Sequence, residues 1–222
     1  TDINKVKESS MTIIFATGNS CKLREASEIL GEGFELVTPA MKGIVEDIPE
    51  TGTTLRANSL QKAQYIFDHA GGADCFADDT GLETDILGGA PGVYSARYAG
   101  PEKSFSANID KLLDEMARRE YEASVAREYG LETPNATRRA RFKTVITLIL
   151  NGEKHFFEGV MEGRISYARV GNGGFGYDPV FIADEYPDVT VAELTDDQKN
   201  AISHRGKALR AMAAWLHEHA SK

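Results

Sequence analysis

The chain has 222 residues, of which 41% are hydrophobic and 27% are charged, which is typical of a globular protein with one domain or two closely packed lobes. Its formal net charge of −9 argues against sequence-independent binding to nucleic acid, and no apolar run is long enough to span a membrane. The two cysteines, Cys21 and Cys75, lack metal-ligand spacing, so we expect reduced thiols in a cytoplasmic protein.

The first half of the chain alternates strand and helix patterns. Residues 1–10 are polar and lack the apolar core of a signal peptide, so they are interpreted as a disordered extension or an added remnant. Apolar strand patterns at 12–16, 34–37 and 73–77 alternate with helix patterns at 22–30 and 54–70. This order is the beginning of an α/β fold.

The second half predicts one long helix followed mainly by strands. The helix pattern covers 104–129, and the highly charged residues 118–139 are interpreted as a helical extension plus an exposed loop. Strands are predicted at 141–150 and 155–160, joined by a hairpin turn at Asn151-Gly152, and at 180–183, before a closing helical region at 196–218. Because these strands come without intervening helices, we expect a mixed sheet.

Two adjacent carboxylates, Asp78 and Asp79, follow the apolar segment 73–77 and precede Thr80. Neighbouring acids repel each other, so a fold tolerates them best in solvent or beside a cation. Two interpretations stay open, a solvated turn after the strand and a site for a hard ion such as Mg²⁺. Glu50 alone is typical of solvated surface, but it would give that ion a third carboxylate.

Residues 17–22 join the first strand to the first helix and are interpreted as a candidate anion-binding loop. Backbone N–H groups and the dipole at a helix N-terminus favour an anion. Thr17 and Asn19 add neutral hydrogen-bonding groups, and Lys22 adds a positive charge. The loop is not a Walker A motif, and capping the helix is the commoner use of such a Thr or Asn.

Two later segments carry groups suited to a planar polar ligand. Glycines at 173, 174 and 176 surround Phe175, so another planar group can approach its ring, and Asp178 can accept hydrogen bonds from a base. The alternative is a tight turn whose Phe packs into the core. Lys199, His204 and Arg205 can donate to phosphate or carbonyl oxygens, although basic residues on a terminal helix are usually solvated.

Taken together and in this order, these segments resemble the inosine triphosphatase family, the Ham1-type nucleoside triphosphate pyrophosphatases. The similar motifs are Thr-Gly-Asn-x-x-Lys, Glu-Thr-Gly with Asn and Lys on the next helix, Asp-Asp-Ser-Gly-Leu with Gly-Gly-Ala-Pro-Gly-Val-Tyr-Ser-Ala-Arg-Tyr, Gly-Phe-Gly-Tyr-Asp-Pro, and Ser-His-Arg-Gly. The resemblance runs from about residue 12 to residue 216. Thr80 replaces the Ser of the acidic motif, and Ala57 replaces a Glu common in the helix after Glu-Thr-Gly.

The resemblance implies an α/β fold with a mixed twisted sheet, flanking helices and two lobes around a central cleft. It implies a single domain over residues 11–222, with an insertion at about 118–139. It also implies Mg²⁺-dependent attack of water on ITP, dITP and XTP to release the monophosphate and pyrophosphate, which cleanses the nucleotide pool, and usually a homodimer.

The resemblance also implies roles for individual residues. Asp79, Asp78 and Lys22 would be catalytic, with one of the aspartates as the base, and Glu50 and Asp79 would bind the metal. The family's substrate-binding positions match Thr17, Gly18, Asn19, Lys22, Thr80, Phe175, Gly176, Tyr177, Asp178, Lys199, His204 and Arg205.

Within that set, Thr17, Asn19 and Lys22 would hold the triphosphate, with Lys199 nearby. Phe175 would stack on the base, while Asp178, His204 and Arg205 would contact its edge. Two alternative functions stay open: a Maf-like pyrophosphatase of other modified nucleotides, and a nucleotide-binding regulatory protein without catalysis. The carboxylates and lysines favour an enzyme over the regulatory protein.

Overall fold

A seven-stranded mixed sheet runs through the computed structural model, which describes residues 10–219; the predicted extension at 1–10 lies almost wholly outside the described residues. The strand order is β2-β1-β3-β5-β6-β7, with β4 paired to β3. The pairs β1–β2 and β1–β3 are parallel and the others are antiparallel, as the mixed-sheet prediction required. The strands are β1 Met11–Phe15, β2 Phe34–Val37, β3 Cys75–Thr84, β4 Pro91–Gly92, β5 Arg139–Leu150, β6 Glu153–Ile165 and β7 Phe181–Ala183.

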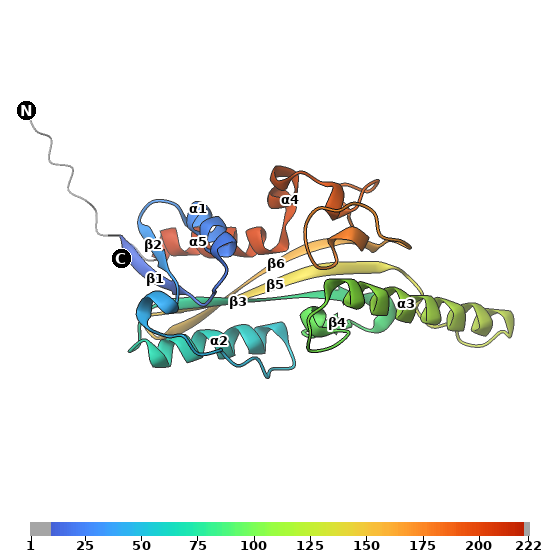
Figure 1. Ribbon diagram of the computed structural model, residues 1–222, viewed down its shortest axis with the longest axis horizontal. Coiled ribbons are helices and arrows are strands. Elements are labelled where there is room, and N and C mark those ends of the chain that lie inside the picture. Colours follow the sequence, from blue (N-terminus) through green and yellow to red (C-terminus); the bar gives the residue numbers. More distant parts are fainter. Residues whose placement is uncertain (1–9, 220–222) are drawn as a thin grey trace, which may run out of the picture.

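Helices cover both faces of the sheet at the end that contains β1 and β2. Helices α1 and α5 lie on one face and α2 lies on the other, while α3 extends from the opposite end of the molecule (Figure 1). No helix within residues 10–219 has the length and apolarity needed to cross a membrane. The helices are α1 Ser20–Leu30, α2 Leu55–His69, α3 Phe105–Glu128, α4 Asp196–Ile202 and α5 His204–His219; the 3-10 helices are η1 Ala40–Lys42, η2 Asp85–Leu87, η3 Ser95–Arg97, η4 Asp178–Val180 and η5 Val191–Glu193.

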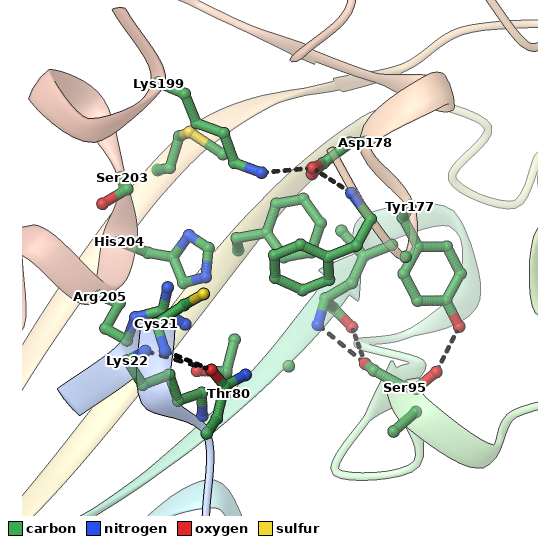
Figure 2. Close-up of a pocket in the computed structure, with 18 of the residues that line it drawn as sticks. Cys21, Lys22, Thr80, Ser95, Tyr177, Asp178, Lys199, Ser203, His204 and Arg205 are labelled. Atoms are coloured by element: carbon green, nitrogen blue, oxygen red, sulfur yellow. Dashed lines mark hydrogen bonds and ion pairs between the residues drawn. The ribbon is translucent and has the colours of Figure 1, made fainter. Parts of the chain in front are cut away.

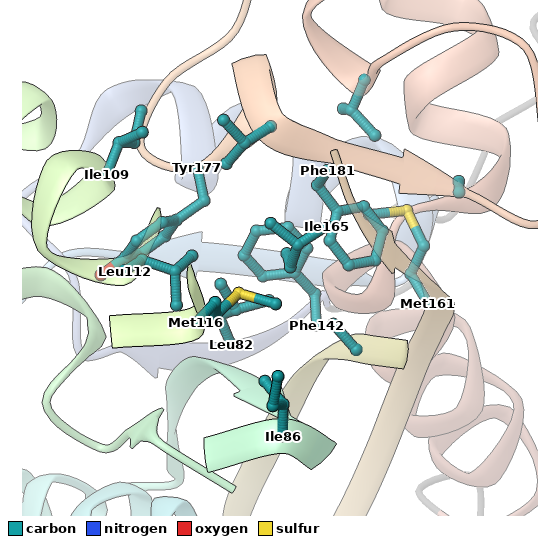
Figure 3. Close-up of a cluster of buried hydrophobic side chains, with 14 of the residues drawn as sticks. Leu82, Ile86, Ile109, Leu112, Met116, Phe142, Met161, Ile165, Tyr177 and Phe181 are labelled. Atoms are coloured by element: carbon teal, nitrogen blue, oxygen red, sulfur yellow. The ribbon is translucent and has the colours of Figure 1, made fainter. Parts of the chain in front are cut away.

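Three clusters of buried side chains account for this arrangement. One fills the space between the sheet and α1 and α5, and a second lies under α2. The third joins α3 to the far halves of β5 and β6, with Phe142 and Phe181 packed ring against ring at 4.7 Å (Figure 3). The long strands β5 and β6 therefore connect the first two clusters, at one end of the sheet, with the third cluster at the other end. The predicted division into two lobes around a cleft stays a prediction.

Local signals located most of the elements correctly. The Asn151-Gly152 turn closes the β5–β6 hairpin with both residues at positive φ, and Leu150 is paired with Glu153 across it. This is the two-residue turn whose twist matches that of the strands. The charged segment after residue 118 does continue α3, as far as Glu128, and residues 129–135 are an exposed loop. Its identity as an insertion stays a prediction.

Two predicted boundaries are wrong. The strand predicted to end at Ala77 continues to Thr84, so Asp78 and Asp79 lie within β3 and not in a loop after it. The closing helical region is two helices, because Ser203 has an extended backbone (φ −61°, ψ 140°) and its hydroxyl accepts a hydrogen bond from Gly206 N. This break places His204 at the first position of α5.

Candidate active site

The acidic pair lies near the point at which the order of the strands in the sheet reverses, between β1 and β3. Strand β1 has β2 on one side and β3 on the other, both parallel to it. In such sheets ligands bind outside the carboxyl ends of the strands, where the order reverses. The β1–β3 pairing ends at Phe15 and Phe76, so β3 continues past β1 with one edge uncovered by it. Asp78 and Asp79 lie in this continuation.

The two carboxylates point to opposite faces of the sheet, because successive side chains of a strand alternate. Asp78 receives a charge-assisted hydrogen bond from Lys22 of α1, whose Nζ lies 2.8 Å from its Oδ2. Asp79 lies on the α2 side, where Lys62 Nζ is 3.7 Å from its Oδ1. The mutual repulsion that favoured a solvated turn is therefore offset, since each acid has its own lysine. The solvated-turn interpretation is wrong.

The pKa values of the two aspartates are shifted in opposite directions. Burial raises the pKa of Asp78, but the positive charges of Lys22, Lys62 and Arg205 together lower it below its ordinary value. Burial also raises the pKa of Asp79, and here the opposing effect of Lys62 is too weak to reverse it, while Glu50 raises it further. Asp78 is therefore firmly ionised, and Asp79 binds protons more readily than an ordinary aspartate.

A lysine lies between the two carboxylates predicted to bind metal. Lys62 Nζ is 2.8 Å from Glu50 Oε1 and 3.7 Å from Asp79 Oδ1. Burial lowers the pKa of Lys62, but the neighbouring carboxylates raise it above its ordinary value. Asp79 Oδ2 is buried without a hydrogen-bond partner, as is the Nδ2 of Asn58, whose Oδ1 accepts from Gly52 N at 2.7 Å.

The orphaned oxygen of Asp79 makes this donor set suitable for a divalent cation. Mg²⁺ in nucleotide sites usually takes one or two carboxylates and completes its shell with water and phosphate oxygens. Glu50 and Asp79 are such a pair. Within residues 10–219 no three His, Cys, Asp or Glu side chains gather closely enough to hold a metal by themselves. The residues therefore fit a metal that arrives with a phosphate ligand.

Two cavities share Lys22 in their walls. The first, of about 420 Å³, has a wall of aromatic side chains that includes Phe142, Phe175 and Tyr177 (Figure 2). The second, of about 630 Å³, is bordered by polar groups and by the backbone of the loop after β1. Most of the predicted residues divide accordingly, and Asp79 borders neither cavity: Thr17, Gly18, Glu50 and Asp78 border the second cavity, while Asn19, Thr80, Phe175, Gly176, Tyr177, Asp178, Lys199, His204 and Arg205 border the first.

The loop after β1 caps α1 and borders the second cavity. Asn19 is the N-cap of α1, since its Oδ1 accepts from Cys21 N at 2.9 Å and from Lys22 N at 3.2 Å. Thr17 Oγ1 accepts from Asn19 N at 3.1 Å. The capping interpretation is thus confirmed for Asn19. It leaves the Lys22 side chain bordering both cavities, where it can contact an anion in either.

Phe175 is not a core residue. Its side chain is 59% exposed, so the alternative of a turn with a buried ring is wrong. Asp178 holds the turn through its Oδ2, which accepts from Phe175 N at 2.9 Å and from Lys199 Nζ at 2.5 Å. Gly174 must be a glycine, because a Cβ there would lie 2.1 Å from that oxygen and its φ is +70°. Lys199 lies 4.7 Å from the Phe175 ring centroid.

His204 and Arg205 enter the first cavity from the start of α5. The His204 ring stacks on Phe142 at 5.0 Å, and burial lowers its pKa to about 3, with Arg205 contributing. Its Nδ1 is buried without a partner. Arg205 Nε donates to Glu25 Oε2 at 2.8 Å. A Cβ on Gly159 of β6 would lie 1.9 Å from the His204 carbonyl oxygen, so this glycine permits the close approach of α5 to the sheet.

Three side chains predicted to bind substrate make hydrogen bonds or ion pairs within the protein. Thr80 Oγ1 is 2.7 Å from Thr144 Oγ1, and Tyr177 donates its hydroxyl hydrogen to Ser95 O at 2.7 Å. Lys199 pairs with Asp178 beside Phe175 and not with the phosphate-side residues.

The sequence-based site omitted two charged residues that the structure places in it. Lys62 joins the carboxylates, and Glu25 orients Arg205. Lys62 had a signal, since it belongs to the helix after Glu-Thr-Gly. Glu25 had none, because its partner lies 180 residues away.

Comparisons with known proteins identify the family of the chain. A model of the Ham1 family matches residues 13–215. The dITP/XTP pyrophosphatase of Christiangramia forsetii is 44% identical over 206 residues, which are 93% of this chain and 99% of that protein. The dITP/XTP pyrophosphatase of Bacillus subtilis is 42% identical over 205 residues, covering 91% and 96% respectively.

Solved structures show the same fold. The Ham1 protein of Staphylococcus aureus has a TM-score of 0.79 at 34% identity, covering 93% of this chain and 98% of that one. A HAM1 protein from Coxiella burnetii has a TM-score of 0.79 at 35% identity, covering 94% and 99%.

Proposed function

The chain belongs to the Ham1 family, and we propose that it is a nucleoside triphosphate pyrophosphatase that hydrolyses ITP, dITP and XTP to the monophosphate and pyrophosphate. The observation that carries the proposal is that Lys22 borders both an aromatic cavity and a cavity that contains charged residues, including its own partner Asp78. A purine fits the first, and the triphosphate extends past Lys22 into the second.

At the phosphate end, Lys22 and Lys62 supply positive charge beside the loop of Thr17 and Gly18. Hydrolysis between the α and β phosphates needs neutralisation of developing charge and a positioned water. Asp79 is the better candidate for the general base, because its raised pKa and its unpartnered oxygen suit it to accept a proton. Asp78 holds Lys22, which borders both cavities.

The charge balance of the site favours a cation accompanying the substrate. Two lysines, Lys22 and Lys62, stand against the carboxylates Glu50, Asp78 and Asp79 and two more on the wall of the same cavity, those of Glu46 and Asp47, so the site carries a net charge of −3 before any triphosphate arrives. A bound Mg²⁺ would polarise phosphate oxygens and stabilise charge in the transition state. Glu50 and Asp79 would hold it, with Lys62 free to turn toward a phosphate oxygen.

At the base end, Phe175 offers an exposed ring for stacking, while His204 and Arg205 offer donors. His204 is uncharged because burial lowers its pKa to about 3, so it donates through one ring nitrogen only. Hypoxanthine and xanthine present an oxygen at the purine 6-position, as guanine does, whereas adenine presents an amino group; rejection of guanine must therefore depend on its 2-amino group. A buried donor left unpaired against adenine would cost about 1–3 kcal/mol. Asp178 and Lys199 border the same cavity, where they would contact the base.

The biological setting follows from the chemistry. Removing deaminated purine triphosphates from a cytoplasmic nucleotide pool would prevent their incorporation into DNA or RNA. We also propose a homodimer as the working form, with neither nucleic acid nor membrane as a partner.

One assay tests the proposal and its alternatives. Pyrophosphate release is measured from ITP, dITP, XTP, dUTP, ATP and GTP, with and without Mg²⁺. We expect Mg²⁺-dependent turnover of the first three and much slower turnover of ATP and GTP. Equal rates on all six would contradict the assigned specificity, preference for dUTP would favour a Maf-like activity, and nucleotide binding without turnover would favour the regulatory protein.

A further inference from the structure

A second exposed aromatic side chain borders the aromatic cavity. Phe105, the first residue of α3, is 51% exposed, and its ring centroid lies 6.4 Å from that of Phe175, with an angle of 44° between the planes. Isolated apolar side chains on a surface need no explanation. Two half-exposed phenyl rings that form a tilted pair on the wall of one cavity differ from that ordinary case, because together they present a continuous apolar surface to a ligand in the cavity.

The position of Phe105 follows from the apolar face of α3. Residues 105, 109, 112 and 116 share one side of the helix, and the last three are buried in the core around Phe142. Phe105 is thus the N-terminal end of that apolar face, one helical turn before Ile109, the first apolar residue of α3 that is buried in the core. Ser104 caps the helix by accepting from Ala107 N at 3.2 Å, so the Phe105 ring is not needed to begin the helix.

Hydrogen bonds fix the backbone of the first turn of α3 and connect it to the loop that leads to Phe175. Asn108 ties the first turn of α3 to η3, with its Oδ1 accepting from Ala99 N at 2.7 Å and its Nδ2 donating to Ala96 O at 3.0 Å. Arg169, in the loop that leads to Phe175, donates to Ser106 O at 2.7 Å and pairs with Asp110 at 2.8 Å. The loop and the helix start are therefore fastened to each other while both side chains stay open to the cavity.

We propose that Phe105 is a second base-contacting side chain, which packs against the purine from the α3 side while Phe175 stacks on it. This proposal rests on the proposed function. A base between two parallel rings needs centroids about 7 Å apart, at contact distances of about 3.5 Å on each side. The observed 6.4 Å requires only a small parting and flattening of the tilted pair.

Steady-state kinetics with ITP and Mg²⁺ test the proposal. Stacking on an aromatic side chain stabilises a bound base, so Phe105→Ala should raise KM for ITP by about tenfold, which corresponds to about 1.4 kcal/mol. Its kcat should change less than twofold, because the contact is the same in the ground state and the transition state. Phe105→Trp should keep the KM near that of the wild type. Tyr121→Ala is the matched control, since Tyr121 is an exposed aromatic residue of the same helix outside the cavity.

A binding measurement separates this proposal from the proposed function. IMP, which carries the same base without the β and γ phosphates, is titrated into Phe105→Trp and Tyr121→Trp, and we expect quenching of tryptophan fluorescence in the first only. A wild-type KM for Phe105→Ala, or equal changes in Phe105→Ala and Tyr121→Ala, would overturn the role of Phe105. If the wild type does not hydrolyse ITP, the proposed function fails, and quenching confined to Phe105→Trp still decides whether Phe105 contacts the nucleotide.

Discussion

Replacing Asp78 and Asp79 one at a time by Asn should change stability in different ways, although the residues are neighbours. The Asp78 side chain is 3% exposed and its partner Lys22 is 28% exposed. Removing one partner of a buried ion pair typically costs about 3–5 kcal/mol. Because water can reach part of the Lys22 side chain, we expect Asp78→Asn to lower the free energy of unfolding by about 2–3 kcal/mol.

Asp79→Asn should leave the free energy of unfolding within about 1 kcal/mol of the wild type, or raise it, because Asp79 Oδ2 has no hydrogen bond to lose. Lys62 keeps Glu50 as its partner at 2.8 Å. The pH dependence has a definite sign. A carboxyl whose pKa is higher in the folded than in the unfolded protein destabilises the fold as pH rises above the unfolded value of 3.8 through the folded value.

For Asp78 the sign is opposite, since its folded pKa is lowered: its stabilisation is present above 3.8 and is lost as pH falls through the folded value. Unfolding by guanidinium is followed through the fluorescence of Trp215, the single tryptophan, between pH 4 and 8. The stability difference between Asp79→Asn and the wild type should increase with pH. Turnover of ITP by Asp79→Asn should fall by a factor of about 10² or more, with ITP binding retained. Equal destabilisation by both substitutions, or near-normal turnover by Asp79→Asn, would refute the reasoning.

Three further predictions follow from single contacts. Lys199→Gln should raise KM for ITP and lower the free energy of unfolding by about 1–3 kcal/mol, because it removes the ion pair from buried Asp178; kinetics and denaturation measure the two effects. Gly159→Ala should cost about 3 kcal/mol or more by forcing α5 off β6, and thermal unfolding at the wild-type midpoint would contradict it. His204 has a pKa of about 3, so it does not titrate near pH 6.5. The profile of kcat/KM against pH should therefore have the same shape in that region for the wild type and for His204→Gln.

Elements that depend on local pattern could be predicted from the sequence. The β5–β6 hairpin is an example, because Asn151 and Gly152 suit a two-residue turn whichever strands they join. The length of β3 could not be predicted, because residues 78–81 have the composition of a turn. They are extended because each pairs with a residue of β5, as Asp79 does with Val145. Strand propensity is weak against such long-range pairing.

The candidate site was predictable as a set of motifs but not as a set of partners. Sequence order placed Lys22 with the phosphate groups and left Lys199 without a defined contact. The fold pairs Lys22 with Asp78 and Lys199 with Asp178, across 56 and 21 residues. Such pairings depend on which helix covers which face of the sheet, and periodicity within one segment carries no information about that.

The placement of the acidic pair explains why one ligand can meet two carboxylates that point away from each other. Within a covered strand, residues on opposite faces have separate surroundings. Beyond Phe76, however, β3 is no longer bordered by β1, and the loop after β1 lies beside an open edge. In the proposed function, a polyphosphate lying along that edge would contact Lys22 on one face and Lys62 on the other without passing through the sheet. The two faces of β3 thus become two sides of one site only because β1 ends where it does.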